Sequence, residues 1–286
     1  MTNIQDYAQH LSRLPLSPHT RRNYLLRVKQ YVNWLQAVPA ASSALSDTVD
    51  RDFAVRDYRA FLLQRGFSAS TVNSALTAID SFYLFLGIKG AKTKRQELPK
   101  LAPRALDPEE LRRLLKAIAQ SKSLRNKTVA MLMLHCGLRI SEAYALNISD
   151  VLLSARKREL IVRCGKNDKR RTVPINKDAA GVLQEYLASD KRTDQEAPLF
   201  VSRKGFRLSQ PAIDHLIRMF GRDAGVSLSS HSLRHTCLTR LVRAGVDIVT
   251  VAEIAGHSRL ETTRRYSLPT EEVMIAAMER LNYQAS

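Results

Sequence analysis

The sequence has little of what marks secreted, membrane-spanning or disulfide-stabilised proteins. Its three cysteines, Cys136, Cys164 and Cys237, are an odd and widely spaced set, which favours a reducing compartment over a disulfide framework. The N-terminal stretch carries Asp6 and lacks the apolar core of a secretory signal. The longest apolar run, Val129 to Leu134, is far too short to cross a bilayer. These absences predict a cytoplasmic protein with no membrane partner.

Acidic residues are also scarce relative to basic ones. The 286 residues include 45 Lys and Arg against 27 Asp and Glu, which gives a net charge of +18. The excess is spread along the chain, because residues 1–100 carry 14 basic and 7 acidic residues and residues 101–286 carry 31 and 20. Such a basic protein usually binds a polyanion, most often nucleic acid, although solubility alone is the simpler explanation.

The hydrophobic fraction of 44% supplies enough apolar residues for the cores of two domains. This composition excludes a disordered chain, a collagen-like chain and a small disulfide scaffold. Residues 1–88 show three helical patterns, of which the first opens with a capping hydroxyl and a proline at Ser17-Pro18 and continues to Leu35. The other two span residues 51–63 and 68–86. We therefore predict an N-terminal helical bundle whose first helix has a basic outer side.

Residues 89–106 are predicted to link this bundle to a second domain. Between Lys89 and Arg104 the chain has six basic residues and two prolines against one acidic residue, Glu97. Such a composition is typical of an extended segment, which either follows DNA phosphates or is an ordinary solvated loop.

Residues 107–286 are predicted to form a mainly helical domain with one small antiparallel sheet. Asp107-Pro108-Glu109-Glu110 has the cap, the proline and the carboxylates of a first helical turn. Two short β-prone runs, 159–163 and 171–175, flank Gly165-Lys166-Asn167-Asp168, which is a hairpin signal. The predicted fold class is therefore mainly α with a small antiparallel sheet.

Several candidate chemical groups in this half have simpler explanations when each is taken alone. Arg139 and Glu142 fit a surface ion pair at a corner between two helices. Lys166, at the hairpin tip, fits an ordinary charged turn. His257 fits a helix cap or a core histidine, and Tyr266 fits a core aromatic residue.

The segment from His231 to Cys237 carries two histidines and an arginine. His231 and His235 are four residues apart, which suits a metal site, but no third ligand of the right kind lies nearby and Cys237 is on another side of the helix. His231 beside Arg234 suits a phosphate better, because an imidazole transfers a proton and a guanidinium neutralises charge. With Tyr266 nearby, the combined segments indicate attack on a phosphodiester, whose transition state gains negative charge.

These motifs resemble those of a known family, the tyrosine recombinases, also called the phage-integrase family. The segments beginning at His231, Ala244 and Gly256, followed by Tyr266, resemble its C-terminal signature, and Gly137 to Glu142 is similar to its first arginine box. The N-terminal helical patterns resemble its SAM-like core-binding domain. The compact two-domain layout is similar to Xer-type recombinases and transposon co-integrate resolvases. Departures from the family pattern fall at packing positions: Ala255, His135-Cys136 and Ser267-Leu268.

The resemblance implies a nucleophile and its phosphate ligands. Tyr266 would attack the scissile phosphate, form a 3′-phosphotyrosyl link and free a 5′-hydroxyl. Arg139 and Arg234 would hold the non-bridging oxygens, and His257 would donate a hydrogen bond to the same phosphate.

The resemblance also implies which residues transfer protons. His231 would handle the tyrosine proton, and Lys166 would protonate the leaving 5′-oxygen. Glu142 would orient or screen the catalytic side chains without contacting the phosphate itself. No metal or nucleotide cofactor is implied, because the covalent link conserves the bond energy for religation.

The partners implied by the resemblance are DNA and further copies of the chain. The chain would act on double-stranded DNA with a specific core site, as a homotetramer on two paired sites, and would exchange strands through a Holliday junction. Directionality can depend on accessory DNA sites or proteins. The catalytic domain, 107–286, would end in a helix near 271–281 that docks on a neighbouring protomer or packs on its own core.

The biological outcome stays open between integration, excision, replicon-dimer resolution and co-integrate resolution. Two other functions are considered: a type IB topoisomerase, which the short N-terminal domain disfavours, and a non-catalytic architectural DNA-binding protein. The filled catalytic positions argue against the second of these.

Overall fold

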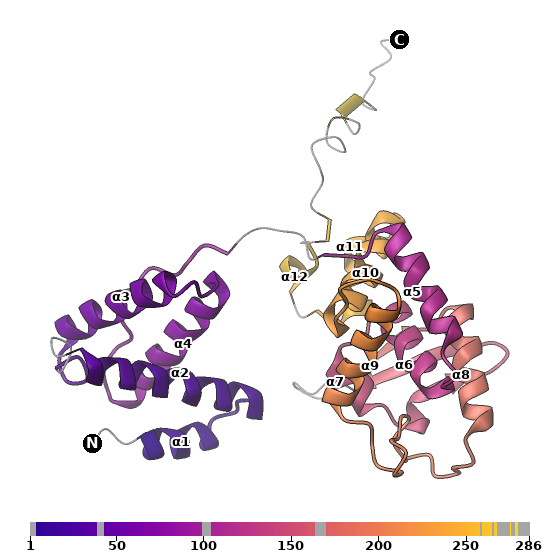
Figure 1. Cartoon of the computed structure of the whole chain (residues 1–286), viewed down its shortest axis with the longest axis horizontal. Helices are drawn as coiled ribbons and strands as arrows, with labels where there is room; N and C mark the ends of the chain where they lie inside the picture. Colours follow the sequence, from indigo (N-terminus) through magenta and orange to yellow (C-terminus); the bar gives the residue numbers. More distant parts are fainter. Residues whose placement is uncertain are drawn as a thin grey trace. The chain divides into compact units, whose positions relative to one another are not determined.

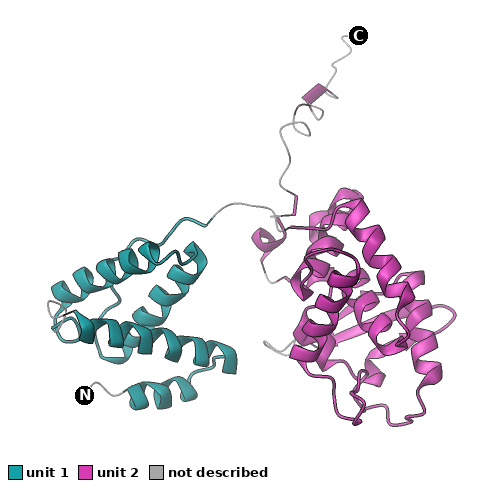
Figure 2. Ribbon diagram, viewed as in Figure 1, with its two compact units in different colours: residues 1–100 teal, residues 101–286 magenta. Residues whose placement is uncertain are grey.

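The protein consists of two compact units, residues 1–100 and residues 101–286 (Figure 2). The computed structural model describes residues 4–38, 43–98, 104–163, 170–257, 259–264, 266–267, 275 and 278–279. Helices dominate both units and the described strands form one antiparallel sheet, so the predicted fold class is confirmed (Figure 1).

The described part of unit 1 is a bundle of four helices. They are α1 (Ile4–Arg13), α2 (Pro18–Ala37), α3 (Thr48–Gln64) and α4 (Ala69–Phe85). The last three confirm the predicted helices, and the hydroxyls of Ser17 and Ser68 cap α2 and α4 by accepting backbone N–H groups. Helix α1 is not among the three predicted helices. It adds Tyr7 to the core, where the centroid of the tyrosine ring lies 5.1 Å from that of Phe82.

Residues 89–98, in the segment predicted to be a linker, belong to unit 1 and contact its helices. The backbone N–H of Ala91 donates to Asp80 and that of Lys92 donates to Asp52. Arg95 forms a salt bridge with Asp80, with 2.5 Å between Nη2 and Oδ2. The charge of Arg95 is therefore already paired within unit 1.

Unit 2 surrounds a central helix with further helices and the sheet. Its helices are α5 (Pro108–Gln120), α6 (Leu124–His135), α7 (Ile140–Ala145), the 3₁₀ helix η2 (Ile148–Asp150), α8 (Lys177–Ser189), α9 (Gln210–Asp223), α10 (Ser230–Arg243), α11 (Ile248–Ala255) and α12 (Leu260–Arg264). The apolar run Val129–Leu134 is buried throughout and lies in α6, which packs on α5, α8 and α10. A helical stretch that is apolar on all sides is stable only inside a core, so residues 129–134 place α6 at the centre of unit 2.

The sheet of unit 2 has the strand order β1-β2-β3, with antiparallel neighbours. The strands are β1 (Val151–Leu153), β2 (Arg158–Arg163) and β3 (Arg170–Pro174). Pairing of β2 with β3, with Leu160 opposite Val173, confirms the predicted hairpin, whereas β1 is an additional strand. The hairpin tip, with Lys166, lies outside the described residues.

The helix predicted at residues 271–281 also lies outside the described residues, apart from Ile275, Met278 and Glu279. In the described part of the chain, none of the helices combines the length and hydrophobicity that crossing a membrane requires.

Candidate active site

Helix α11 ends at Gly256, and the last carbonyl oxygens of the helix accept hydrogen bonds from side chains. Gly256 has a φ of 61°, in the left-handed region, which glycine adopts without a steric penalty. The N–H groups of Gly256 and His257 donate back to Glu253 and Ala252, each at 3.0 Å, which is the pairing of a Schellman motif. The carbonyl oxygens of residues 254–256 then remain available as acceptors at the negative end of the helix.

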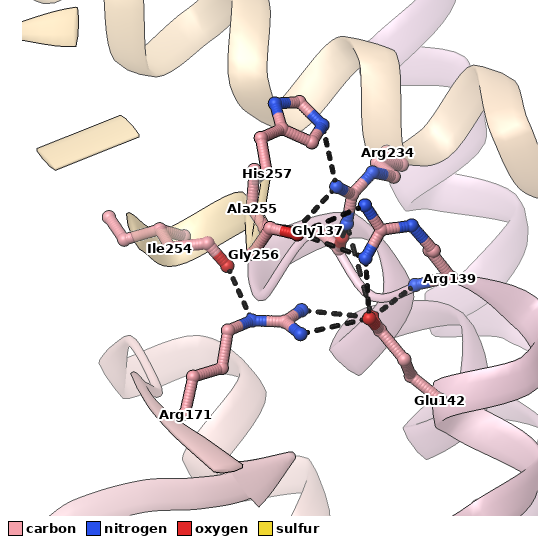
Figure 3. A network of polar contacts seen from close by, with 9 residues as sticks. All are labelled: Gly137, Arg139, Glu142, Arg171, Arg234, Ile254, Ala255, Gly256 and His257. Carbon is pink, nitrogen blue, oxygen red and sulfur yellow. Dashed lines mark hydrogen bonds and ion pairs between the residues drawn. The ribbon is translucent and has the colours of Figure 1, made fainter. Parts of the chain in front are cut away.

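Three arginines from three different elements donate to those carbonyls (Figure 3). Arg171 of β3 donates from Nε to Ile254 at 3.0 Å, and Arg234 of α10 donates from Nη2 to Ala255 at 2.6 Å. Arg139, the N-cap residue of α7, donates to Ala255 and to the carbonyl after it, each at 3.3 Å. Arg139 of the first arginine box and Arg234 of the C-terminal signature therefore meet at the end of α11.

Glu142 is the buried anion that binds these arginines together. Its two oxygens accept both Nη groups of Arg171, at 2.8 and 2.9 Å, and one of them accepts Nη1 of Arg139 at 2.7 Å. Burial alone would raise the pKa of Glu142, but the hydrogen bonds and charges of Arg171 and Arg139 outweigh it and hold the pKa at about 2. Glu142 is therefore a permanent carboxylate that fixes the positions of the guanidinium groups.

Arg234 is 5% exposed, yet it keeps its charge. Its Nη1 donates to the carbonyl of Gly137 at 2.6 Å. This glycine has a φ of 59° and lies just after the end of α6. Burial, followed by the positive charge of Arg139, lowers the pKa of Arg234 to about 10. The guanidinium is protonated at neutral pH and is held from two sides.

His257 lies between Arg234 and Thr263. Its Nε2 is 3.0 Å from Nη2 of Arg234, and its Nδ1 is 2.7 Å from the hydroxyl of Thr263. A guanidinium only donates hydrogen bonds, so Nε2 accepts and the ring proton is on Nδ1. Burial, then the charges of Arg234 and Arg139, lowers the pKa of His257 to about 4, so this imidazole is neutral at neutral pH.

Tyr266 lies beside these groups, just beyond α12. Its ring is 8% exposed, packs in a cluster with Leu238 and Val251, and is nearly parallel to the ring of His257, with centroids 6.3 Å apart. Its hydroxyl is 2.7 Å from Nδ1 of His235. The fold thus brings four of the six predicted site residues together: Arg139, Arg234, His257 and Tyr266.

The other two predicted residues, His231 and Lys166, are not part of this cluster in the described structure. His231 is exposed on the first turn of α10, and its ring centroid is 6.4 Å from that of His235, which itself contacts the phenol. Lys166 lies outside the described residues.

Sequence reasoning missed two residues of this site, Arg171 and His235. In the sequence, Arg171 is one of several basic residues around the hairpin tip. However, it shares a face of its strand with the buried Val173, two residues on, and this alternation is a usable signal. His235 stood out in the sequence only as a partner of His231 in a metal site.

Comparison with known proteins identifies both parts of the chain. Residues 104–272 match the model of the phage integrase family, and residues 4–90 match that of the phage integrase N-terminal SAM-like domain. The chain is 33% identical over 282 residues to tyrosine recombinase XerA of Thermococcus kodakarensis, covering 97% of this chain and 94% of the relative. It is 34% identical over 233 residues to tyrosine recombinase XerC of Roseiflexus castenholzii, covering 74% and 73%.

Two solved structures share the fold. The XerH site-specific recombinase bound to a palindromic difH substrate, a post-cleavage complex, has a TM-score of 0.73 at 21% identity and covers 91% of this chain and 79% of its own. The Tn1549 transposon integrase in complex with circular intermediate DNA has a TM-score of 0.72 at 22% identity and covers 98% and 100%.

Proposed function

The chain belongs to the phage integrase family and is a tyrosine-type site-specific recombinase, and from this premise we propose that it breaks and rejoins DNA through a covalent bond to Tyr266. The observation that carries the proposal is the convergence of Arg139, Arg234 and His257 beside the buried phenol. Cationic hydrogen-bond donors, a neutral imidazole and an aromatic alcohol are the groups that displacement at a phosphodiester needs.

In the first step, the oxygen of Tyr266 forms a bond to the scissile phosphorus and the bond from phosphorus to the 5′-oxygen breaks. The tyrosine proton leaves to a base and the departing 5′-oxygen takes up a proton, so that a 3′-phosphotyrosyl link and a 5′-hydroxyl remain. In the second step, a 5′-hydroxyl from the partner duplex attacks the same phosphorus and releases the tyrosine. Arg139 and Arg234 hold the non-bridging oxygens; Glu142 and the carbonyls of α11 keep both guanidinium groups in place before DNA arrives.

His257 must change its hydrogen bonding to serve the phosphate. Its Nε2 accepts from Arg234, so it has no proton there to donate. When a phosphate accepts the N–H of Arg234 instead, Nε2 is released, and the nearby negative charge favours a proton on it. We assign His231 to the tyrosine proton and Lys166 to the leaving oxygen on the strength of the family resemblance.

We propose that the substrate is double-stranded DNA with a specific core site, bound by four copies of the chain on two paired sites. Strand exchange then proceeds through a Holliday junction, and unit 1 serves as the core-binding domain. The net charge of +18 and the DNA complexes among the structural neighbours support a DNA partner.

One experiment identifies both the target sequence and the nucleophile. The wild-type protein is incubated with a pool of nicked duplexes whose central sequence is randomised, and DNA that stays attached to protein in SDS is recovered and sequenced. We expect one core sequence to be enriched, with Tyr266 linked to a 3′-phosphate. Tyr266→Phe should bind the enriched duplex and trap none of it, because it lacks the attacking oxygen.

Three results would contradict this proposal. Equal trapping by Tyr266→Phe would assign the nucleophile elsewhere, and binding without any trapping by the wild type would indicate an architectural protein. Relaxation of supercoiled plasmid without exchange between two copies of the enriched site would instead indicate a topoisomerase.

A further inference from the structure

We infer that His235 is the residue that holds the nucleophilic oxygen of Tyr266 in position for attack. The inference rests on the proposed function, because it takes that oxygen as the attacking atom. It starts from the hydrogen bond of 2.7 Å between Nδ1 of His235 and the phenolic oxygen. The family resemblance implied that His231, one helical turn earlier, handles the proton of the tyrosine.

The surroundings of Tyr266 explain why such a bond is needed. The tyrosine follows the five-residue helix α12, and its backbone N–H donates to Thr263 at 2.9 Å. Its ring packs on Leu238, Val251 and Ala255. Apolar packing is not directional, whereas a hydrogen bond restricts both distance and angle. The bond to His235 therefore fixes where the reactive oxygen lies.

The position of His235 on α10 links the nucleophile to the phosphate ligands. His235 directly follows Arg234, and successive helical residues point about 100° apart. Arg234 turns towards the end of α11, while His235 turns towards Tyr266, with ring centroids 5.6 Å apart. One rigid helix thus sets the spacing between a phosphate ligand and the attacking oxygen, which is what an in-line displacement requires.

Because Nδ1 of His235 makes the contact, substitutions that keep or move a polar atom at that position test the inference. An asparagine side chain places its amide close to where Nδ1 of histidine lies, whereas a glutamine reaches the more distant Nε2 position. Asparagine can form the hydrogen bond but cannot take up a proton at neutral pH. Restoration by asparagine therefore separates a positioning role from that of a proton acceptor and from simple filling of space.

The experiment compares four variants on the enriched nicked duplex, at saturating protein and in a single turnover. We expect His235→Ala and His235→Gln to form the covalent complex about tenfold more slowly than the wild type, the effect of losing one hydrogen bond in the transition state. His235→Asn should react at close to the wild-type rate. His215→Asn, at an exposed position of α9, is the matched control and should have no effect.

Binding and folding are measured on the same proteins. All variants should bind the duplex as the wild type does and unfold at similar urea concentrations, so that a slower rate reports the chemical step. A wild-type or faster rate in His235→Ala would overturn the inference, and so would an Asn variant as slow as the Ala variant. Absence of trapping by the wild-type protein would instead refute the proposed function, and the inference would fall with it.

Discussion

Arg171 and Glu142 form an ion pair that is almost fully removed from solvent. Their side chains are 9% and 6% exposed, and the guanidinium binds both carboxylate oxygens. Such a pair is costly to break, because the remaining charge is left buried with fewer partners. Arg171 also donates to the end of α11, so this residue of β3 supports Arg139 and Arg234, the proposed phosphate ligands, through Glu142 and α11.

We predict that Arg171→Ala lowers the free energy of unfolding by about 3 kcal/mol, the typical cost of stranding one partner of a buried pair. Urea denaturation followed by far-UV circular dichroism measures this change. The matched control is Arg112→Ala, which breaks a pair with Glu109 in which the arginine is 71% exposed. It should change the free energy by less than about 1 kcal/mol. Equal effects of the two substitutions would show that the buried pair has no special importance.

Helices α10 and α11 both end at left-handed glycines, but the two ends have different neighbours. Gly245, after α10, has a φ of 81° and nothing within 4 Å of where a Cβ would stand. At Gly256, after α11, a Cβ would lie 2.7 Å from Nη1 of Arg171. Only the end of α11 therefore depends on glycine both for its backbone conformation and for the close approach of a site residue.

We predict that Gly245→Ala lowers the free energy of unfolding by about 1 to 2 kcal/mol, the cost of a left-handed alanine. Gly256→Ala should lower it by more, because its methyl group also meets the side chain of Arg171. Gly256→Ala should in addition slow covalent trapping, because the new methyl group displaces Arg171 and with it Glu142. Trapping by Gly245→Ala should match the wild type. The measurements are urea denaturation and the single-turnover rate on the enriched duplex. If both variants trapped DNA equally fast, the contact between the glycine and the arginine would have no role in the site.

The positive charge of the whole molecule predicts how it binds DNA. Both units are basic in sequence, and neutralising phosphates releases condensed counterions. We predict that the logarithm of the affinity for duplex DNA falls linearly with the logarithm of the salt concentration, by about 0.9 for each phosphate contacted. Fluorescence anisotropy with a labelled duplex at several salt concentrations gives this slope. A flat dependence would mean that the charge serves solubility and that few phosphates are bound.

The sequence by itself determined the fold class, several of the helices, the β2–β3 pair and the candidate groups Arg139, Arg234, His257 and Tyr266. Capping residues such as Ser17 and Asp107 mark helix starts, because their side chains accept backbone N–H groups that the helix leaves open. Apolar residues at helical spacing predicted α2, α3 and α4, and two β-prone runs on either side of residues 165–168 predicted the pairing of β2 with β3. The spacing of Arg139, Arg234 and Tyr266 within their motifs was sufficient to indicate the family.

Only the tertiary structure decided which residues meet at the site. Arg139 contacts a carbonyl 116 residues away, and Arg171 binds a carboxylate 29 residues before it on a different element. Periodicity reports which face of one element is buried, but not which element packs against that face. The alternation with Val173 marks the face of β3 that Arg171 occupies. Which groups Arg171 and His235 contact depends on how β3, α10 and α11 pack together, so local patterns in the sequence could not assign those contacts.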